Sequence, residues 1–480
     1  MQKLSGAHFH PSILIGWLSF GIVCGVVAAQ LRLGCDGALL VSLICGFGGF
    51  WLRNYAGTVL VIVAGLLIGI WRGGIELDSL KKIAPFYNTT INLTGVIVDD
   101  PEYGKKGDQR FRLGDVRIGG QKMPGKIWAS SYTILDLKRS DQVVMKGKLR
   151  EGFGSFAASM SFATVVSAKR PPLNDVPREA RDWFAAGIRN AIPEPQASLG
   201  VGYLVGQRSA LPESLDEQLR IAGLTHIVVA SGYNLTVLVR FGRRLFSKYS
   251  KYLAFLTASG MISGFVLITG FSPSMSRAAL VAGLSLVAWY YGRRVHPLLL
   301  LVFAAAVTVL VNPFFIWGDI GWYLSFAAFG GVLLLSPLLT HLLYRGKEAG
   351  FFPQLLIETT SAQIVTLPII LYMFGTLSVV SLPANLLVLP LVPLAMLLTF
   401  LAGITGVIAP AVAGWVGVPA NAVLGYMTAV VDWIASLPGA QTTVPFDTVA
   451  LVASYIGIIA ALLFLWHRTK HDFRGDSIIE

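Results

Sequence analysis

The chain has 480 residues, of which 54% are hydrophobic and 13% are charged, and its formal net charge is +12. A soluble globular protein has roughly a quarter charged residues, so this composition excludes a soluble enzyme, a disordered chain and a fibrous repeat. Residues 81–182 are the exception, because they hold 29 Asp, Glu, Lys and Arg residues with a net charge of +7. We therefore expect one water-exposed domain within a membrane protein.

Apolar runs of the length that crosses a hydrocarbon core lie on both sides of that window, and they predict about 11–12 membrane segments. The runs cover residues 12–31, 37–52, 55–71, 223–239, 252–270, 274–291, 297–312, 320–343, 353–375, 381–403, 411–437 and 448–466. The polar residues Ser231 and Asn234 favour a re-entrant or cavity-lining segment at 223–239. Four prolines between 381 and 410 predict broken helices there.

Lys and Arg collect in alternate loops, as they do in cytoplasmic loops of membrane proteins. With the N-terminus inside, three spans place the charged window outside, and the later basic loops fall inside. Those loops contain Arg240, Arg243, Arg244, Lys248 and Lys251, then Arg293 and Arg294, then Arg345 and Lys347, and finally Arg468, Lys470 and Arg474. Both termini are therefore predicted to be cytoplasmic.

The charged window reads as a β domain. Its strings INLTGVIVDD and QVVMKGKLRE are rich in β-formers, and EYGKKGDQ and RIGGQKMPG supply turn residues. Short strands over about 90 residues predict a small barrel of the OB type. Residues 176–190 predict an amphipathic helix that lies along the membrane surface or packs on the barrel.

The predicted fold class is a polytopic α-helical membrane protein with an inserted extracytoplasmic OB-like β-barrel. Five parts follow from the patterns above. They are N-terminal spans at 1–75, the β domain at 81–172, an amphipathic connecting helix at 173–205, a second transmembrane domain at 206–466, for which the resemblance described below implies a channel, and a basic cytoplasmic tail at 467–480.

The polar string GQRSALPESLDEQLRIAGLTHIVVASGYNLTVLVRFGRR, residues 206–244, stands out in this apolar chain. Polar groups at membrane depth are costly unless they are paired, so they usually face a cavity or another helix. His226 is a protonatable pore or hinge residue or an interfacial helix end. Ser231 is a nucleophile or, beside a glycine, a site of close helix approach. Asn234 lines a polar path or cross-links helices.

Three later polar residues have similar alternatives. Arg277 either snorkels to the interface or contacts a phosphate. Gln363 and Asn385 form structural hydrogen bonds or line a path. The chain has no His-Glu-x-x-His, Walker or Gly-x-Gly-Asp motif, and no two His residues within a segment have metal-site spacing. His467 and His471 lie four residues apart, but in the basic tail, where solvation is the better reading. We therefore expect no enzyme activity, no cofactor and no metal, and transport driven by a partner or a gradient.

The 206–244 string resembles the competence domain of the ComEC/Rec2 family, the membrane channel through which transformable bacteria take up single-stranded DNA. The matching residues are Gly206, Arg208, Ser209, Leu211, Gly223, Leu224, His226, Ser231 and Gly232. Three later blocks also match, through Arg277, Ala278, Gly292 and Arg293, through Leu324, Ser325, Phe326 and Ala327, and through Gln363, Thr366, Pro368, Phe374, Asn385, Leu386 and Pro390.

The resemblance implies a bacterial cytoplasmic membrane protein with an extracytoplasmic OB-like domain. It also implies single-stranded DNA as substrate and a separate DNA receptor, cytoplasmic motor and nuclease as partners. The family pattern differs at Gln207, Asn234 and Tyr323. The metallo-β-lactamase-like domain of many relatives has a His-x-His-x-Asp-His signature that is absent here. At this length we expect the chain to transport DNA without cutting it.

Single-strand binders combine a basic groove with aromatic stacking faces. In the β domain we expect DNA contacts, with a generic solvated surface as the alternative, at Lys105, Lys106, Arg110, Arg112, Lys122, Lys126 and Trp128. Strand alternation predicts Arg110 and Arg112 on one face and Phe111 on the other. We also predict that residues 81–172 bind single strands with salt-sensitive affinity.

A polyanion that crosses an apolar slab needs a polar, donor-rich lining. The candidate lining residues are Arg208, His226, Ser231, Asn234, Arg277, Gln363 and Asn385. The predicted function is uptake of single-stranded DNA during natural transformation. One alternative is a transporter of a lipid-linked or sugar polyanion. The last alternative is an intramembrane hydrolase that uses Ser231 and His226.

Overall fold

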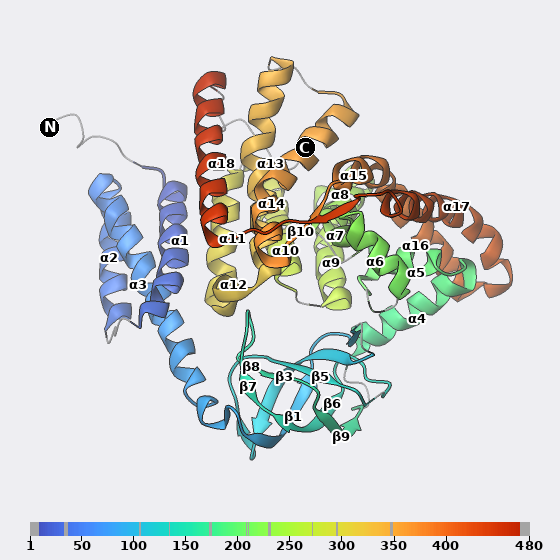
Figure 1. Ribbon diagram of the computed structural model, residues 1–480. Coiled ribbons are helices and arrows are strands. Elements are labelled where there is room, and N and C mark those ends of the chain that lie inside the picture. The colour runs from blue at the N-terminus through green and yellow to red at the C-terminus, as the bar shows by residue number, and fades with distance from the viewer. Residues whose placement is uncertain are drawn as a thin grey trace. The chain divides into compact units, whose positions relative to one another are not determined.

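The structure is a computed structural model, drawn in Figure 1. It describes residues 9–32, 37–104, 107–133, 135–171, 175–207, 209, 211–228, 232–270, 272–293, 296–345 and 349–470. The chain divides into two compact units. The first is Met1–Val176 with Leu299–Trp322, and the second is Pro177–Leu298 with Tyr323–Glu480.

Three N-terminal helices, α1 (Pro11–Ala28), α2 (Ala38–Leu52) and α3 (Tyr55–Leu80), begin the first unit. Helices α1 and α3 cross with their backbones in contact. A Cβ on Gly25 would lie 2.2 Å from the Leu66 carbonyl oxygen. Gly21, Gly65 and Gly69 are equally confined at this crossing. Small residues allow such close helix approach in apolar surroundings, where helix association depends on van der Waals packing.

Helices α11 (Pro297–Val311) and α12 (Phe314–Gly318) join the N-terminal helices. The Arg72 side chain, on α3, donates from Nε to the Leu310 carbonyl at 2.8 Å. Trp317 donates from its indole nitrogen to the Val26 carbonyl at 2.9 Å. These bonds satisfy polar groups where an apolar bundle offers them few other partners.

A β-sheet is present in the window where strands are predicted. Its strands are β1 (Thr90–Ile97), β2 (Glu102–Tyr103), β3 (Gln109–Ile118), β4 (Gln121–Lys122), β5 (Ile127–Ser131), β6 (Gln142–Lys148), β7 (Arg150–Glu151), β8 (Ala158–Met160) and β9 (Thr164–Lys169). The main hydrogen-bonded order is β7-β8-β5-β3-β1-β6-β9. The β5–β8 pair is parallel and the other pairs along this path are antiparallel. Leu93, Leu113 and Met145 lie in the core beneath it.

The second unit begins with α4 (Val176–Ala191) and α5 (Gln196–Val205). The helix predicted at 176–190 is present, but its apolar side packs on a helix of the second unit. A Cβ on Gly403 of α16 (Val392–Ile408) would lie 2.7 Å from the Phe184 ring and 2.9 Å from Ile188. The backbones approach closely because glycine lies on both sides, at Gly187 and Gly406. The sequence did not predict this contact between α4 and α16.

The other elements of the second unit are α6 (Glu213–Ile221), α7 (Thr225–Val228), α8 (Gly232–Phe246), α9 (Lys251–Thr269), α10 (Pro273–Tyr290), α13 (Ile320–Tyr344), α14 (Phe351–Phe374), β10 (Thr376–Ser378), α15 (Ser381–Val388), η4 (Leu389–Leu391), α16, α17 (Pro410–Ala435), β11 (Gln441–Thr443) and α18 (Thr448–Thr469). The break predicted between 381 and 410 is confirmed by the succession of α15, η4 and α16. The predicted run 223–239 contains two helices, α7 and α8, on either side of residues 229–231, which lie outside the described residues.

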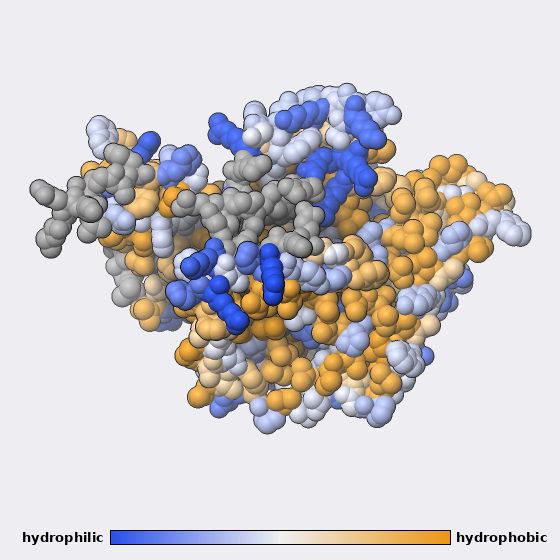
Figure 2. All heavy atoms as spheres, turned by 90° about the horizontal axis from the view of Figure 1, so that it is seen from above, coloured by the Kyte–Doolittle hydropathy of each residue, from blue (hydrophilic) through white to orange (hydrophobic). Residues whose placement is uncertain are grey.

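Eight helices of the described residues are long and apolar enough to cross a membrane, and two apolar helices, Ala38–Leu52 and Pro297–Val311, are shorter. Hydrophobic side chains cover broad areas of the helical surface (Figure 2). Helix α18 has no buried residue, and Ile456 and Phe464 are both exposed. A bilayer accommodates such a surface better than water does. The protein is a multi-pass helical membrane protein, as its composition predicts.

Candidate functional site

Arg277 is a buried cation near the start of α10. Its side chain is 9% exposed, and its Nε donates to the Ser325 hydroxyl at 2.7 Å. The guanidinium lies 5.0 Å from the Phe329 ring centroid and 5.9 Å from that of Phe326. Among the described residues no carboxylate forms an ion pair with it. A guanidinium has five N–H donors, so donors remain available on a charge that is costly to bury alone.

Gly232, the first residue of α8, faces this guanidinium. A Cβ at Gly232 would lie 3.1 Å from Arg277 Nη2 and 3.1 Å from the Ala278 Cβ. The Ser325 hydroxyl in turn lies 3.3 Å from the Ser274 hydroxyl. Three sequence blocks that are far apart in the chain therefore meet at one point, which we call the Arg277 cluster: Gly232, Ser274, Arg277, Ala278, Ser325, Phe326 and Phe329.

A second polar cluster surrounds Ser381, the first residue of α15. The Gln363 side-chain amide, on α14, donates to the Ser381 hydroxyl. Asn385 donates from Nδ2 to the Ser381 carbonyl at 2.8 Å. Asn385 Oδ1 is buried and accepts no hydrogen bond from the described residues. Gln363 and Asn385 therefore form structural hydrogen bonds, which is one of the two alternatives that the sequence offers for them. The amide oxygen of Asn385 can still accept a further hydrogen bond.

The first and fourth sequence blocks meet at Gly223. Its φ of 72° is left-handed, and a Cβ there would lie 2.6 Å from the Ser381 Cβ. The Ser378 hydroxyl, on β10, donates to the Ile221 carbonyl at 2.6 Å. The ribbon of β10 and β11 thus holds the end of α6. Glycine is required because another residue would be strained and would collide with Ser381.

His226 and Asn234 occupy different environments. The exposed His226 ring has Nδ1 3.1 Å from the Gly223 carbonyl oxygen, so Nδ1 carries the proton in this contact. Asn234 is 0% exposed and donates from Nδ2 to the Tyr203 carbonyl at 3.1 Å. The bond joins α8 to α5, which favours the helix cross-link over the lining role. Arg208 and Ser231 lie outside the described residues.

In the sheet domain, Arg110 and Arg112 are exposed on β3 and Phe111 is buried, as alternation predicts. Three of the cations that are predicted to contact DNA form ion pairs with carboxylates. The ion pairs are Arg110–Asp108 at 2.7 Å, Arg112–Asp99 at 3.1 Å and Lys122–Asp115 at 2.5 Å. The hydrogen bond from Lys122 lowers the pKa of Asp115, with the positive charges of Lys122 and Arg117 acting in the same direction. Lys126 is half-buried, and Lys105 and Lys106 lie outside the described residues.

Aromatic rings share the outward face of β3 and β5. Trp128 lies directly opposite Arg112 in the register and has the Phe153 ring 5.6 Å away. Tyr132 and Phe162 stack at 5.2 Å and are 53% and 58% exposed. The arginines and the stacking rings therefore share one face of the domain. Phe111, which points inward, would by itself suggest that they lie on opposite faces. Sequence reasoning missed Phe153 and Phe162 because they lie in the turns beside β8, where no alternation marks a face.

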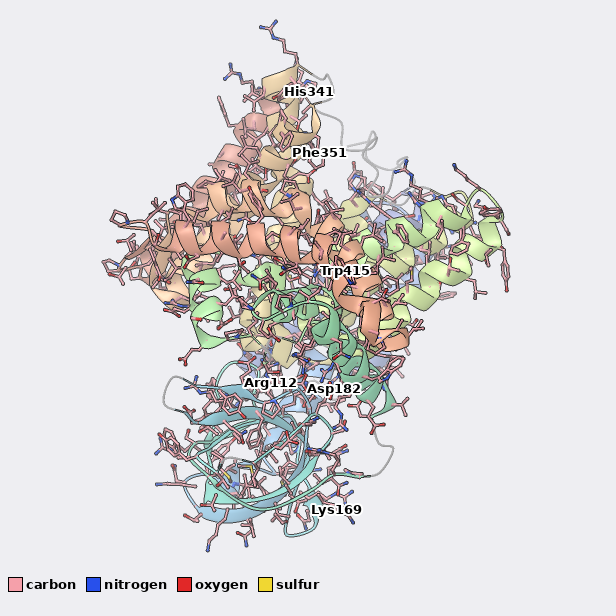
Figure 3. The ribbon with its side chains drawn as sticks, turned by 90° about the vertical axis from the view of Figure 1, so that its right-hand side faces the viewer. Arg112, Lys169, Asp182, His341, Phe351 and Trp415 are labelled. Atoms are coloured by element: carbon pink, nitrogen blue, oxygen red, sulfur yellow. The ribbon has the colours of Figure 1, made fainter. Side chains whose placement is uncertain are left out.

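Other cations of the sheet domain lie elsewhere. Lys146 and Lys148 are exposed on β6, and no carboxylate among the described residues pairs with them. Figure 3 shows Arg112 and Lys169 at well-separated places on the domain. The domain thus has an aromatic face with ion-paired arginines on β3 and, on β6, a lysine row that consists of Lys146 and Lys148. Among the described residues, no group of three or more His, Cys, Asp or Glu side chains could hold a metal ion.

The sequence profile of the Competence protein family matches residues 203–469, which is more than half of the chain. The chain belongs to this family. Both the Arg277 cluster and the polar residues around Ser381 lie within the matched region. The resemblance stated from the sequence blocks is thereby confirmed.

Two curated relatives each match a little under half of the chain. The chain is 27% identical over 236 residues to "ComE operon protein 3" of Bacillus subtilis, covering 47% of this chain and 28% of that protein. It is 29% identical over 244 residues to "Competence protein ComA" of Neisseria gonorrhoeae, covering 46% of this chain and 33% of that protein. The matches span about a third or less of these relatives. No solved structure matches the chain.

Proposed function

We propose that this competence-family protein conducts single-stranded DNA across the cytoplasmic membrane during natural transformation. The observation that carries the proposal is Arg277, a buried cation without a carboxylate partner among the described residues, where three sequence blocks meet. A cation in that position is stabilised when a phosphate passes it, because the phosphate supplies the missing negative charge. A bound chloride or headgroup would do the same, so the nature of the anion is what an experiment must decide.

The membrane path that we propose uses the two polar clusters. The Arg277 cluster offers guanidinium and hydroxyl donors, and the cluster around Ser381 offers the amide oxygen of Asn385. Donors suit phosphates, and amide groups suit the edges of unstacked bases. His226, which is exposed beside Gly223, belongs to the same stretch of chain. Asn234 is left out of this path because its side-chain amide joins α8 to α5.

We also propose that the sheet closes into an OB-type barrel. Strands β8 and β9 are separated by residues 161–163 alone, so they form one bent strand that pairs with β5 on one side and β6 on the other. Joined to the meander of β1, β3 and β5, such a strand closes a five-stranded Greek key. The face of its second and third strands, which binds single strands in OB-folds, then carries Arg112 and Trp128.

The proposal assigns transport and no covalent chemistry to the chain, and it leaves DNA capture, the motor and strand degradation to separate proteins. It supposes an extracytoplasmic sheet domain and cytoplasmic termini. A Ser231→Ala variant separates transport from hydrolysis. If the Ser231 hydroxyl is not a nucleophile, this variant supports DNA uptake at the wild-type rate.

The decisive test replaces Arg277 in a transformable host that lacks its own gene for this protein. We expect Arg277→Gln to reduce uptake of labelled DNA roughly a hundredfold, because a lost charge-assisted contact in a dry site costs about 3 kcal/mol. Arg277→Lys keeps the charge and should retain partial uptake. The control is Ser285→Ala, which removes a buried hydroxyl of α10 that has no partner among the described residues. Wild-type uptake by Arg277→Gln at normal expression would refute the path.

A further inference from the structure

Helix α8 has two faces of different chemistry. Its buried face contains Leu235, Val239 and Gly242. Its exposed face contains, at successive turns, Tyr233, Thr236, Arg240 and Arg244, and the exposed Lys248 follows in the next turn of chain. Residues three and four apart lie in line on one side of a helix. We call Tyr233, Thr236, Arg240, Arg244 and Lys248 the α8 row.

Packing fixes the direction in which this row points. Leu235 and Val239 belong to a core shared with α9 and α10, which includes Ala258, Ile262 and Met275. Arg243, next to the row, has its guanidinium 5.4 Å from the Trp289 ring centroid and is half-buried. Arg243 therefore belongs to the packing, whereas Arg240 and Arg244 remain outside it. The exposed apolar residues Phe241 and Leu245 flank the row on one side.

Carboxylates close in sequence do not compensate the positive charge of the row, although the charge of Glu358, on α14, acts on Tyr233 at its first position. No Asp or Glu occurs between Glu217 and Asp319. Among the described residues no carboxylate forms an ion pair with Arg240, Arg244 or Lys248. Like charges four residues apart on a helix repel each other, and lipid tails do not accept such a face. The row needs water and an anionic partner.

The row begins at the Arg277 cluster. Gly232, one residue before Tyr233, is the residue whose Cβ would touch the Arg277 guanidinium. From Gly232 the side chains of the row follow α8 toward its C-terminal end, with a rise of about 5.4 Å per turn. A buried guanidinium, a tyrosine, a threonine and three further cations thus follow one another along one line. Regular spacing of cations along a line suits a polymer with regularly spaced anions, and aromatic rings beside them suit bases.

We infer that the α8 row is the track along which the phosphate backbone of a single strand moves away from Arg277. This inference rests on the proposed function and adds to it the part of the path between Arg277 and the basic end of α8. The alternative occupant of such a row is an anionic lipid headgroup at the membrane surface, which the experiments below separate from DNA.

The first experiment maps proximity in the full chain, reconstituted in lipid nanodiscs. Single cysteines replace Thr236 or Arg240 in a background in which Cys24, Cys35 and Cys45 are serine. An oligothymidylate with thiol-reactive groups along its backbone should cross-link to both positions. The control is Leu256→Cys, since Leu256 is 53% exposed on the neighbouring α9 but lies off the row. Equal cross-linking at all three positions would contradict a defined track.

The second experiment removes charge from the row. We expect the double variant Arg240→Gln and Arg244→Gln to lower the DNA uptake rate at least tenfold. It should also reduce the slope of log affinity against log salt by roughly 1.4, because each single-strand phosphate contact contributes about 0.7. The matched control, Arg468→Gln with Lys470→Gln, removes two cations at the end of α18 and should change neither quantity. Elution volume and Tm of the purified proteins check that both variants fold.

The outcomes separate the inference from the proposed function. If the wild-type protein neither binds nor transports single strands, the proposed function fails and the track fails with it. If the wild type transports DNA while the row cysteines do not react and Arg240→Gln with Arg244→Gln transports normally, only the track is wrong. If that double variant changes binding to phosphatidylglycerol vesicles and leaves DNA uptake intact, the row is a headgroup site and the inference is overturned.

Discussion

Arg277 illustrates how a single residue can be recognised from sequence and understood only in three dimensions. The sequence places a cation beside an apolar run and leaves snorkelling and phosphate contact as alternatives. In the structure the guanidinium is directed at Ser325 and two phenylalanine rings and is buried. This geometry disfavours snorkelling, because a snorkelling arginine extends its head to water. The partners of Arg277 lie about 50 residues away in the chain, and no local pattern predicts them.

Gly223 provides a prediction at the same scale. Gly223→Ala should destabilise the protein by about 1–3 kcal/mol, because its φ of 72° is left-handed and the added Cβ would lie 2.6 Å from Ser381. Thermal unfolding of the detergent-solubilised protein measures the change. Gly283→Ala is the matched control, since a Cβ there meets nothing within 4 Å on a regular helix. An equal Tm for both variants would contradict this prediction, because it would show that the structure accommodates the added Cβ next to Ser381 at little cost.

At the scale of the element, local sequence patterns predict the type of an element and where it breaks, but they do not predict what it contacts. Strand alternation placed Arg110 and Arg112 outward and Phe111 inward, as observed. The prolines after 381 predicted the break between α15 and α16. The amphipathic pattern of α4 predicted a helix, but the pattern does not say what the apolar face meets. That surface is the glycine-lined groove of α16, which only the folded chain forms.

The aromatic face of the sheet domain leads to the next prediction. Trp128→Ala and Phe153→Ala in the full chain should each weaken binding of oligothymidylate by ~1–3 kcal/mol, the worth of one stacked base. Fluorescence anisotropy of a labelled oligonucleotide measures the loss. The comparison variant, Lys146→Gln with Lys148→Gln, removes the lysine row on β6. If the loss of these lysines weakens oligonucleotide binding more than the loss of either ring, the DNA lies along β6 and the proposed aromatic face is wrong.

At the scale of the whole molecule, composition predicts a membrane protein with one polar domain. The described part of the chain has eight long apolar helices and a β-sheet in that domain. The positions of the apolar runs follow from the chemistry of single residues in a bilayer. The candidate path does not follow in this way. Gly232, Arg277 and Ser325 meet in one cluster, Gly223 and Ser381 meet in another, and both clusters form only through helix packing. Arg208 and Ser231, two of the predicted lining residues, lie outside the described residues.

The distribution of Lys and Arg predicts an orientation that labelling can test. In a cysteine-free background, Gly439→Cys in the loop before β11 should react with a membrane-impermeant maleimide in intact cells from which any outer barrier has been removed. Arg468→Cys near the end of α18 should react only after the membrane is opened, because basic ends of spans face the cytoplasm. Reaction of Arg468→Cys in intact cells would reverse the proposed topology.

The backbone contact between α1 and α3 has a consequence for how the sequence can vary. Gly21, Gly25, Gly65 and Gly69 leave no room for even a methyl group. A single alanine at any of them would push two helices apart over their whole crossing. A saturation scan of the gene should therefore find these four codons among the least tolerant in the N-terminal spans, while Leu40 and Phe47, exposed on α2, accept most apolar residues.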